Sequence, residues 1–298
     1  MYSTDTGSDS EQELPDSVQA ELRRVLPAAI ELARLAGEKI MEIYETDFHI
    51  ENKKDNTPVT NADFAANDII VKTLTELTPH IPILSEESDE IPYKERCDWE
   101  TYWLVDPLDG TRAFIEKTGE FSVNIALIYR HHPVIGVIYS PVQKCSFYAC
   151  KGHGAFRLND LDECRSIQVC AQYPVDSSRK IVVAGTRSSR CAALQIFLDN
   201  LTAEFGGYEM KFMGSSLKSC MIAEGEADIY ARLGPTSEWD TAAAQCIVEE
   251  AGGLFTNTQM QSLTYNTKES LLNPDFFVFG DKSIPWKLFL APVSGTRS

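Results

Sequence analysis

The spacing of hydrophobic residues predicts two helices near the start of the chain. Apolar positions recur every three or four residues between Val18 and Tyr44, which is the period of one helix face. Pro27 lies within this stretch and marks either a kink or the first turn of a helix that starts there. A second pattern of this kind starts near Thr60 and ends before Pro79.

After residue 79 the pattern changes to short strands, and later to alternating strands and helices. Runs rich in β-branched and aromatic residues, bounded by turn residues, are typical of strands, and they occupy 83–84, 102–105, 123–129 and 134–139. Beyond about residue 160 we expect a strand at 181–184 and helices at 192–201, 217–223 and 241–251. This order predicts a layered α/β (α+β) fold.

The chain of 298 residues divides into three predicted parts. Residues 1–16 are polar and acidic, and we expect them to form a disordered tail. An N-terminal α+β sub-domain at 17–158 and a C-terminal α/β sub-domain at 159–298 are expected to meet near residues 150–165, with a cleft between them.

The net charge of −17 narrows the classes of partner. Such a surface repels polyanions, and no stripe of Lys and Arg suggests a nucleic-acid interface. No segment has the roughly 20 apolar residues of a membrane span, and the polar N-terminus lacks the pattern of a secretory signal. We therefore expect a cytoplasmic protein that does not bind nucleic acid. Peripheral association with the inner membrane, and the choice between monomer and homodimer, stay open.

The segment at 103–111, WLVDPLDGT, is the strongest candidate for chemistry. An apolar strand leads into Asp106 and Asp109, and it is interrupted by Pro107 and Gly110. A strand end that turns at proline and glycine can aim both carboxylates and the Leu108 carbonyl at one point. Mg²⁺ prefers such hard oxygen ligands. The alternative is an ordinary acidic β-turn.

Other acidic positions have both a functional and a structural interpretation. Glu86 and Glu87 follow a short predicted strand, either as ligands or as part of a solvated loop. Asp240 precedes an alanine-rich helix, where it is a ligand or a residue that stabilises the first turn. Asp63, three residues after Thr60, completes a capping box or holds the attacking water together with a hydroxyl.

Together these motifs resemble the lithium-sensitive inositol monophosphatase superfamily. The likeness is closer to its 3'(2'),5'-bisphosphate nucleotidase branch, and it covers nearly all of residues 29–279. The further segments that carry it are KDNTPVT at 54–60, GEFSVNIAL at 119–127, GSSLK at 214–218, GPT at 234–236 and LNP at 272–274. The resemblance implies a layered αβαβα sandwich of the inositol monophosphatase and fructose-1,6-bisphosphatase type.

The resemblance also implies a site for two or three Mg²⁺ ions. Glu86, Asp106 and the Leu108 carbonyl would bind the first ion. Asp106, Asp109 and Asp240 would bind the second, so that Asp106 bridges the two. A third ion would be held more weakly, through water at Glu86.

By the same resemblance, Asp63 and Thr111 would form a catalytic dyad that orients and activates water. The backbone N–H groups of Gly110 and Thr111 would face the phosphate. The residues expected to contact the substrate are Glu86, Leu108, Asp109, Gly110, Thr111, Gly214, Ser215, Ser216, Lys218, Arg232 and Asp240.

The implied reaction is hydrolysis of 3'-phosphoadenosine 5'-phosphate to AMP and phosphate in sulfate assimilation, with inhibition by lithium. Lys218 and Arg232, with the turn at 214–216, are candidates for holding the nucleotide; an exposed helix lysine is the alternative for Lys218. The segment AGTRS at 184–188, which includes the weaker candidate Arg187, departs from the bacterial pattern. Two alternative hypotheses for the function stay open. The chain could be an inositol or sugar phosphate phosphatase of the same superfamily, or a non-catalytic scaffold that binds divalent cations.

Overall fold

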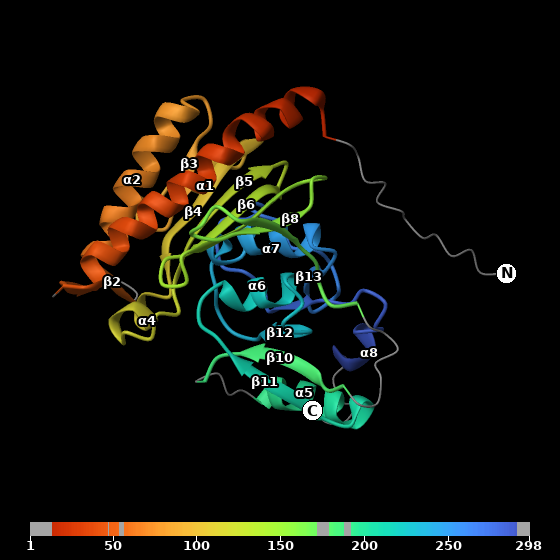
Figure 1. The fold of residues 1–298 in the computed structure, drawn as a ribbon. Helices are drawn as coiled ribbons and strands as arrows, with labels where there is room; N and C mark the ends of the chain where they lie inside the picture. Colours follow the sequence, from red (N-terminus) through yellow and green to blue (C-terminus); the bar gives the residue numbers. More distant parts are fainter. Residues whose placement is uncertain (1–13, 47, 54–56, 172–178, 188–191, 291–298) are drawn as a thin grey trace.

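The computed structural model describes residues 14–46, 48–53, 57–171, 179–187 and 192–290, which form alternating layers of helices and sheets (Figure 1). Helices α1 and α2 cover one face of the first sheet. Helices α6 and α7 lie between the first and second sheets, and α5 and α8 cover the far face of the second (Figure 1). This is the αβαβα sandwich that the family resemblance implies, and the expected fold class is confirmed.

Helices and strands follow one another along the whole described chain. The α-helices are α1 (Asp16–Tyr44), α2 (Asn61–Leu77), α3 (Tyr93–Arg96), α4 (Thr111–Ile115), α5 (Ala192–Phe205), α6 (Leu217–Ala223), α7 (Ala242–Glu250) and α8 (Lys287–Leu290). The strands are β1 (Ile50–Asn52), β2 (Pro58–Thr60), β3 (Ile83–Ser85), β4 (Thr101–Asp109), β5 (Ser122–Tyr129), β6 (His132–Ser140), β7 (Cys145–Cys150), β8 (Ala155–Leu158), β9 (Cys164–Ile167), β10 (Ile181–Gly185), β11 (Tyr208–Phe212), β12 (Ile229–Arg232), β13 (Leu254–Asn257) and β14 (Phe276–Phe279).

Helix α1 runs through Pro27 without ending. Its apolar stripe is buried on both sides of the proline, at Leu22 and Val25 before it and at Ala29 after it. Pro27 itself is exposed, on the side where carbonyl groups without a helical partner can bind water. The helix starts at Asp16, so a start at Pro27 is wrong.

The first sheet contains β3 to β9 in sequence order. Strands β3 and β4 are parallel, and the remaining neighbours are antiparallel. Every residue of β5 is buried, because helices cover both faces of the sheet. A strand in this position is expected to be apolar throughout, so any polar residue within β5 needs a specific partner.

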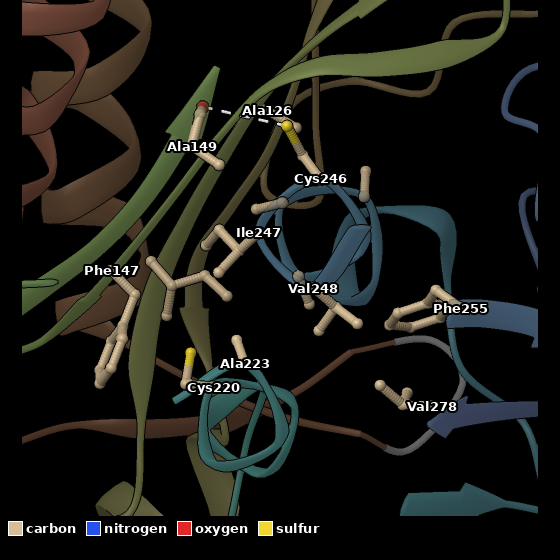
Figure 2. Close-up of a cluster of buried hydrophobic side chains, with 14 of the residues drawn as sticks. Ala126, Phe147, Ala149, Cys220, Ala223, Cys246, Ile247, Val248, Phe255 and Val278 are labelled. Atoms are coloured by element: carbon tan, nitrogen blue, oxygen red, sulfur yellow. Dashed lines mark hydrogen bonds between the residues drawn. The ribbon is translucent and has the colours of Figure 1, made fainter. Parts of the chain in front are cut away.

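The second sheet has the order β11-β10-β12-β14-β13 and combines parallel and antiparallel pairs. A hydrophobic cluster joins it to the first sheet through α6 and α7 (Figure 2). In this cluster Cys246, Ile247 and Val248 of α7 lie between Ala126 and Ala149 of the first sheet and strands β13 and β14 of the second (Figure 2).

Helix α7 packs unusually close to the first sheet because its partner strand carries a glycine. A Cβ atom placed on Gly136 of β6 would lie 2.3 Å from the carbonyl oxygen of Ala243. Ala242, Ala243 and Ala244 at the start of α7 are all buried. Small residues on both sides therefore let the beginning of α7 reach the sheet, and this contact fixes the position of the chain just before it.

Some of the other predictions from the sequence coincide with observed elements, and others stay predictions. The predicted helix at 217–223 coincides with α6, and the predicted strands at 102–105 and 123–129 correspond to parts of β4 and β5. Most of the predicted disordered tail lies outside the described residues. The first sheet continues into β9, past the predicted sub-domain boundary at residue 158, and the division into sub-domains stays a prediction. Among the described helices, none combines the length and the hydrophobicity that crossing a bilayer requires.

We predict that Gly136→Ala destabilises the fold by about 1–3 kcal/mol, because the new methyl group overlaps the backbone of α7. Urea unfolding followed by circular dichroism measures this loss. Gly234→Ala is the matched control, since a Cβ at that position meets no atom within 4 Å. Equal unfolding midpoints for the two variants would show that α7 does not depend on this contact.

Candidate active site

A β-bulge at the end of β4 brings the two aspartates of WLVDPLDGT onto the same face. In a regular strand, residues three positions apart point to opposite faces of the sheet. Pairing with β5 passes from Asp106 opposite Asn124 to Asp109 opposite Ser122, so β4 holds one extra residue in this interval. The extra residue returns Asp109 to the face of Asp106. Pro107 is compatible with the strand because it lies in the bulge.

Glu86, Asp106 and Asp240 lie together although they are far apart in the sequence. One carboxylate oxygen from each residue lies within 4.8 Å of the others. Glu86 directly follows β3, whose pairing with β4 brings the two strand ends side by side. Asp240 ends a 3₁₀ turn, η1 (Glu238–Asp240), immediately before α7. The structure therefore brings together three of the predicted metal ligands.

Each carboxylate in the cluster makes ionisation of its neighbours less favourable. Burial, followed by the charges of neighbouring acids, raises the pKa of Asp106 well above its usual range. Burial, followed by the charge of Asp109, raises the pKa of Asp240 to about 8. Burial also raises the pKa of Glu86, against the effect of Lys53. Carboxylates in this situation are stabilised by a positive charge placed among them.

Hydrogen bonds within the loops fix two of these aspartates. The backbone N–H of Leu108 donates to Asp106 Oδ1 at 3.0 Å. The backbone N–H of Ser237 donates to Asp240 Oδ2 at 2.9 Å, which completes a capping box at η1. A carboxylate can accept about four hydrogen bonds or coordinate bonds in total. Asp240 thus stabilises η1 and not the first turn of α7, which contains no acidic residue, so the predicted place of this structural role is wrong. The capping role at η1 is compatible with a metal site.

Asp63 likewise combines its two expected roles, one on each oxygen. Asp63 Oδ2 accepts hydrogen bonds from the backbone N–H of Thr60 at 2.8 Å and from its hydroxyl at 2.7 Å. Asp63 Oδ1 accepts from the hydroxyl of Thr111 at 3.0 Å. The capping box therefore holds Asp63 in place, and its second oxygen pairs with the other predicted member of the dyad. The Thr111 hydroxyl also lies 3.3 Å from the Leu108 carbonyl oxygen.

Two glycines allow the turn at 214–216 to approach the end of β4. Gly110 has a φ angle of +94°, which a residue with a side chain adopts only at a cost. A Cβ on Gly110 would lie 3.0 Å from the Glu120 carbonyl oxygen, and a Cβ on Gly214 would lie 2.6 Å from the same atom. The Glu120 carbonyl oxygen thus lies between the turns at Gly110 and Gly214, so close to both that a residue with a Cβ atom would collide with it.

Asp109 joins these two turns. Its Oδ2 atom accepts hydrogen bonds from the Ser215 hydroxyl at 2.7 Å, the Ser216 backbone N–H at 2.6 Å and the Ser216 hydroxyl at 2.8 Å. Asp109 is therefore part of the turn at 214–216 as well as part of the bulge.

The alternative interpretation of Lys218 as an exposed lysine is wrong. Its side chain is buried, donates to the Ser215 carbonyl oxygen and lies over the ring of Tyr230, 5.2 Å from the ring centroid. Burial lowers the pKa of Lys218 to about 8. Arg232 donates to the Pro235 carbonyl oxygen at 2.9 Å, whereas the exposed Arg187 pairs with Glu120 at 2.9 Å.

Sequence reasoning missed Lys53, which directly follows β1 and reaches the acidic cluster. Its ammonium lies 2.7 Å from Glu86 Oε1 and 2.5 Å from Glu87 Oε1. Burial disfavours the charge of Lys53, but the two glutamates raise its pKa overall. Its position beside the KDNTPVT segment was the available signal. Sequence reasoning also gave no role to Ser122 and Asn124, although they are polar residues in an apolar strand.

Comparisons with known proteins relate the chain to one family. The family model described as the inositol monophosphatase family matches residues 21–282. The 3'(2'),5'-bisphosphate nucleotidase CysQ of Aggregatibacter actinomycetemcomitans is 40% identical over 267 residues, which are 89% of this chain and 96% of the relative. CysQ of Escherichia coli K12 is 42% identical over 256 residues, which are 85% of this chain and 99% of the relative.

Among solved structures, the crystal structure of CysQ from Bacteroides thetaiotaomicron, a bacterial member of the inositol monophosphatase family, matches with a TM-score of 0.75 and 37% identity. The match covers 87% of this chain and 97% of that chain. The extragenic suppressor protein suhB from Bartonella henselae matches with a TM-score of 0.73 and 28% identity, over 89% of this chain and 98% of that chain. This chain belongs to the inositol monophosphatase family.

Proposed function

We propose that the chain is a Mg²⁺-dependent 3'(2'),5'-bisphosphate nucleotidase that hydrolyses 3'-phosphoadenosine 5'-phosphate to AMP and phosphate in sulfate assimilation. The observation that carries the proposal is the convergence of Glu86, Asp106 and Asp240 beside the hydrogen-bonded pair Thr111–Asp63. The identity of about 40% to bisphosphate nucleotidases, over most of both chains, supports the choice of substrate class. The cytoplasmic location expected from the sequence stays a prediction.

The acidic cluster is suited to divalent cations because it offers carboxylate oxygens that repel one another, from the buried Asp106 and the half-buried Glu86 and Asp240. We assign Glu86, Asp106 and the Leu108 carbonyl to a first ion. Asp106, Asp109 and Asp240 are assigned to a second, and a weaker third ion would lie at Glu86. When bound, the cations would supply a water of lowered pKa and stabilise negative charge on the leaving oxygen.

The residues of the chain itself orient the reactants. Thr111 Oγ1 donates its proton to Asp63 Oδ1, so its lone pairs are free to accept a hydrogen bond from the attacking water. The capping box keeps Asp63 from rotating away from Thr111. The backbone N–H groups of Gly110 and Thr111, at the start of α4, are proposed to bind the phosphate oxygens.

The turn at 214–216, with Lys218 and Arg232, is proposed to select the nucleotide. Lys218 is held against the Ser215 carbonyl, so its charge lies next to this turn. A phosphate near Lys218 would favour the charged ammonium, whose pKa burial has lowered to about 8. The exposed Arg187 is paired with Glu120 and is a weaker candidate.

Initial rates on purified protein with Mg²⁺ test the substrate assignment. We expect kcat/KM for 3'-phosphoadenosine 5'-phosphate to exceed that for inositol 1-phosphate by at least tenfold, and lithium to inhibit the reaction. The reverse preference would assign the chain to inositol or sugar phosphates. No phosphate release from either substrate would leave the non-catalytic scaffold as the explanation.

We predict that Asp106→Asn abolishes hydrolysis while the protein stays folded. The substitution keeps the shape of the side chain and removes the charge of the residue assigned to both ions. The expected loss is more than tenfold in kcat, or more than about 1.4 kcal/mol of transition-state stabilisation. Asp160→Asn, at an exposed position, is the matched control. A variant that retains over roughly a tenth of wild-type turnover would contradict the bridging role.

The raised pKa values of Asp106 and Asp240 predict how stability depends on pH without metal. The folded protein binds these protons more tightly than the unfolded chain. Their contribution to stability is complete below about pH 4, the usual pKa of aspartate, and is lost as the pH rises toward about 8, the pKa of folded Asp240. In EDTA we therefore expect a lower urea unfolding midpoint at pH 8.5 than at pH 6.

Two controls make this prediction specific to the site. Added Mg²⁺ should restore the midpoint at pH 8.5, because a ligand bound only to the folded state stabilises it. Asp106→Asn should reduce the dependence on pH in EDTA. An unfolding midpoint in EDTA that is equal at the two pH values, or higher at pH 8.5, would show that the carboxylates are not destabilised by one another.

A further inference from the structure

Two polar residues of β5 are buried where an apolar strand is expected. Ser122 is 0% exposed and Asn124 is 1% exposed. They lie opposite Asp109 and Asp106 across the bulge, so their side chains share the face of those carboxylates. Burial of a polar side chain is unfavourable unless its hydrogen bonds are made. The partners of Ser122 and Asn124 therefore indicate why these residues are present.

Asn124 links β5 to the turn at 214–216. Its side-chain nitrogen Nδ2 lies 3.0 Å from the Ser216 hydroxyl and, at the longer distance of 3.5 Å, also faces Asp109 Oδ2. Its Oδ1 lies 2.9 Å from the Ser122 hydroxyl. Ser122 Oγ in turn lies 2.5 Å from Ser215 Oγ. Strand β5 thus contacts both serines of the turn that is proposed to bind the nucleotide.

The Ser216 hydroxyl lies between two of the proposed ligands of the second ion. It is 2.8 Å from Asp109 Oδ2 and 2.8 Å from the Asp240 carbonyl oxygen. Because Asn124 Nδ2 can only donate, the Ser216 hydroxyl accepts from Asn124, and its single proton goes to Asp109 or to Asp240. Asn124 therefore directs this proton toward the metal ligands.

The turn itself is held in a strained conformation by the same network. Ser215 has a φ angle of +55°, in a region that residues other than glycine seldom adopt. The Ser215 hydroxyl contacts Asp109 and Ser122, and its carbonyl oxygen accepts from Lys218. Strain of this kind persists where the surroundings fix it, often at functional sites.

We propose that Asn124, acting through Ser216, is a positioning residue that sets the distance between Asp109 and Asp240 and couples metal binding to the shape of the nucleotide turn. Ser216 is only 6% exposed, and its hydroxyl is used by Asn124 and the two aspartates. Its role is therefore to hold ligands rather than to contact substrate through this hydroxyl. The inference rests on the proposed function for the identity of the ions and the nucleotide.

The test measures Mn²⁺ binding without nucleotide, by loss of the electron paramagnetic resonance signal of free Mn²⁺ on titration with protein. Asn124→Leu removes all three side-chain hydrogen bonds and keeps the branching at Cγ. We expect about tenfold weaker binding, the loss typical of residues that orient metal ligands. Ser216→Ala keeps the backbone N–H bond to Asp109 and should weaken Mn²⁺ binding at least threefold. Ser140→Ala is the control, since Ser140 is buried in the neighbouring strand and its hydroxyl has no partner among the described residues.

Ser216→Ala separates positioning from direct substrate contact. If Ser216 acted only by contacting the substrate, Ser216→Ala would raise KM for the nucleotide and leave Mn²⁺ binding within twofold of wild type. That result would overturn the proposal. If Asn124→Leu does not fold, as judged by circular dichroism, Ser216→Ala decides the question. The binding measurement needs no turnover, so absence of nucleotide hydrolysis would overturn the proposed function without deciding the role of Asn124.

Discussion

The active site depends on holding carboxylates together against their mutual repulsion. Glu86, Asp106 and Asp240 each contribute an oxygen to a cluster 4.8 Å across, and burial strengthens the repulsion between them. Unrestrained side chains would rotate toward solvent. Local hydrogen bonds from Leu108 to Asp106 and from Ser237 to Asp240 oppose that rotation. These hydrogen bonds hold the carboxylates in the cluster, and the repulsion between the carboxylates favours cation binding.

The layered fold brings the segments that carry these hydrogen bonds to one place. The bulge of β4, the turn before α6 and the 3₁₀ turn before α7 meet at Ser216, whose hydroxyl contacts Asp109 Oδ2 and the Asp240 carbonyl oxygen. Close packing at Gly136 fixes α7, and the enclosed carbonyl of Glu120 fixes the turn at 214–216 against Gly110. Small residues at these contacts thus have a functional consequence, since they set where Asp240 and Ser216 lie.

From the sequence alone, Asp63 and Asp240 each have a structural and a functional interpretation. The structure shows that the two interpretations are compatible. Asp63 completes a capping box with one oxygen and pairs with Thr111 through the other. Asp240 caps η1 and still belongs to the acidic cluster. A carboxylate has enough acceptor positions to serve both purposes. In this protein the structural role supports the functional one, because it fixes the orientation of the side chain.

The sequence by itself predicted the helices α1, α2, α5, α6 and α7, the strands β3 to β6 and β10, the layered class and the separate acidic motifs, because periodicity and turn residues are local properties. It did not predict the short strands β7, β9 and β11 to β14. It also identified the candidates Asp63, Glu86, Asp106, Asp109 and Asp240. Only the tertiary structure decided that the β4 bulge places Asp106 and Asp109 on one face, that Lys218 is buried, and that Lys53, Ser122 and Asn124 belong to the site. These facts depend on register and on contacts between distant segments, and a linear pattern of residues specifies neither.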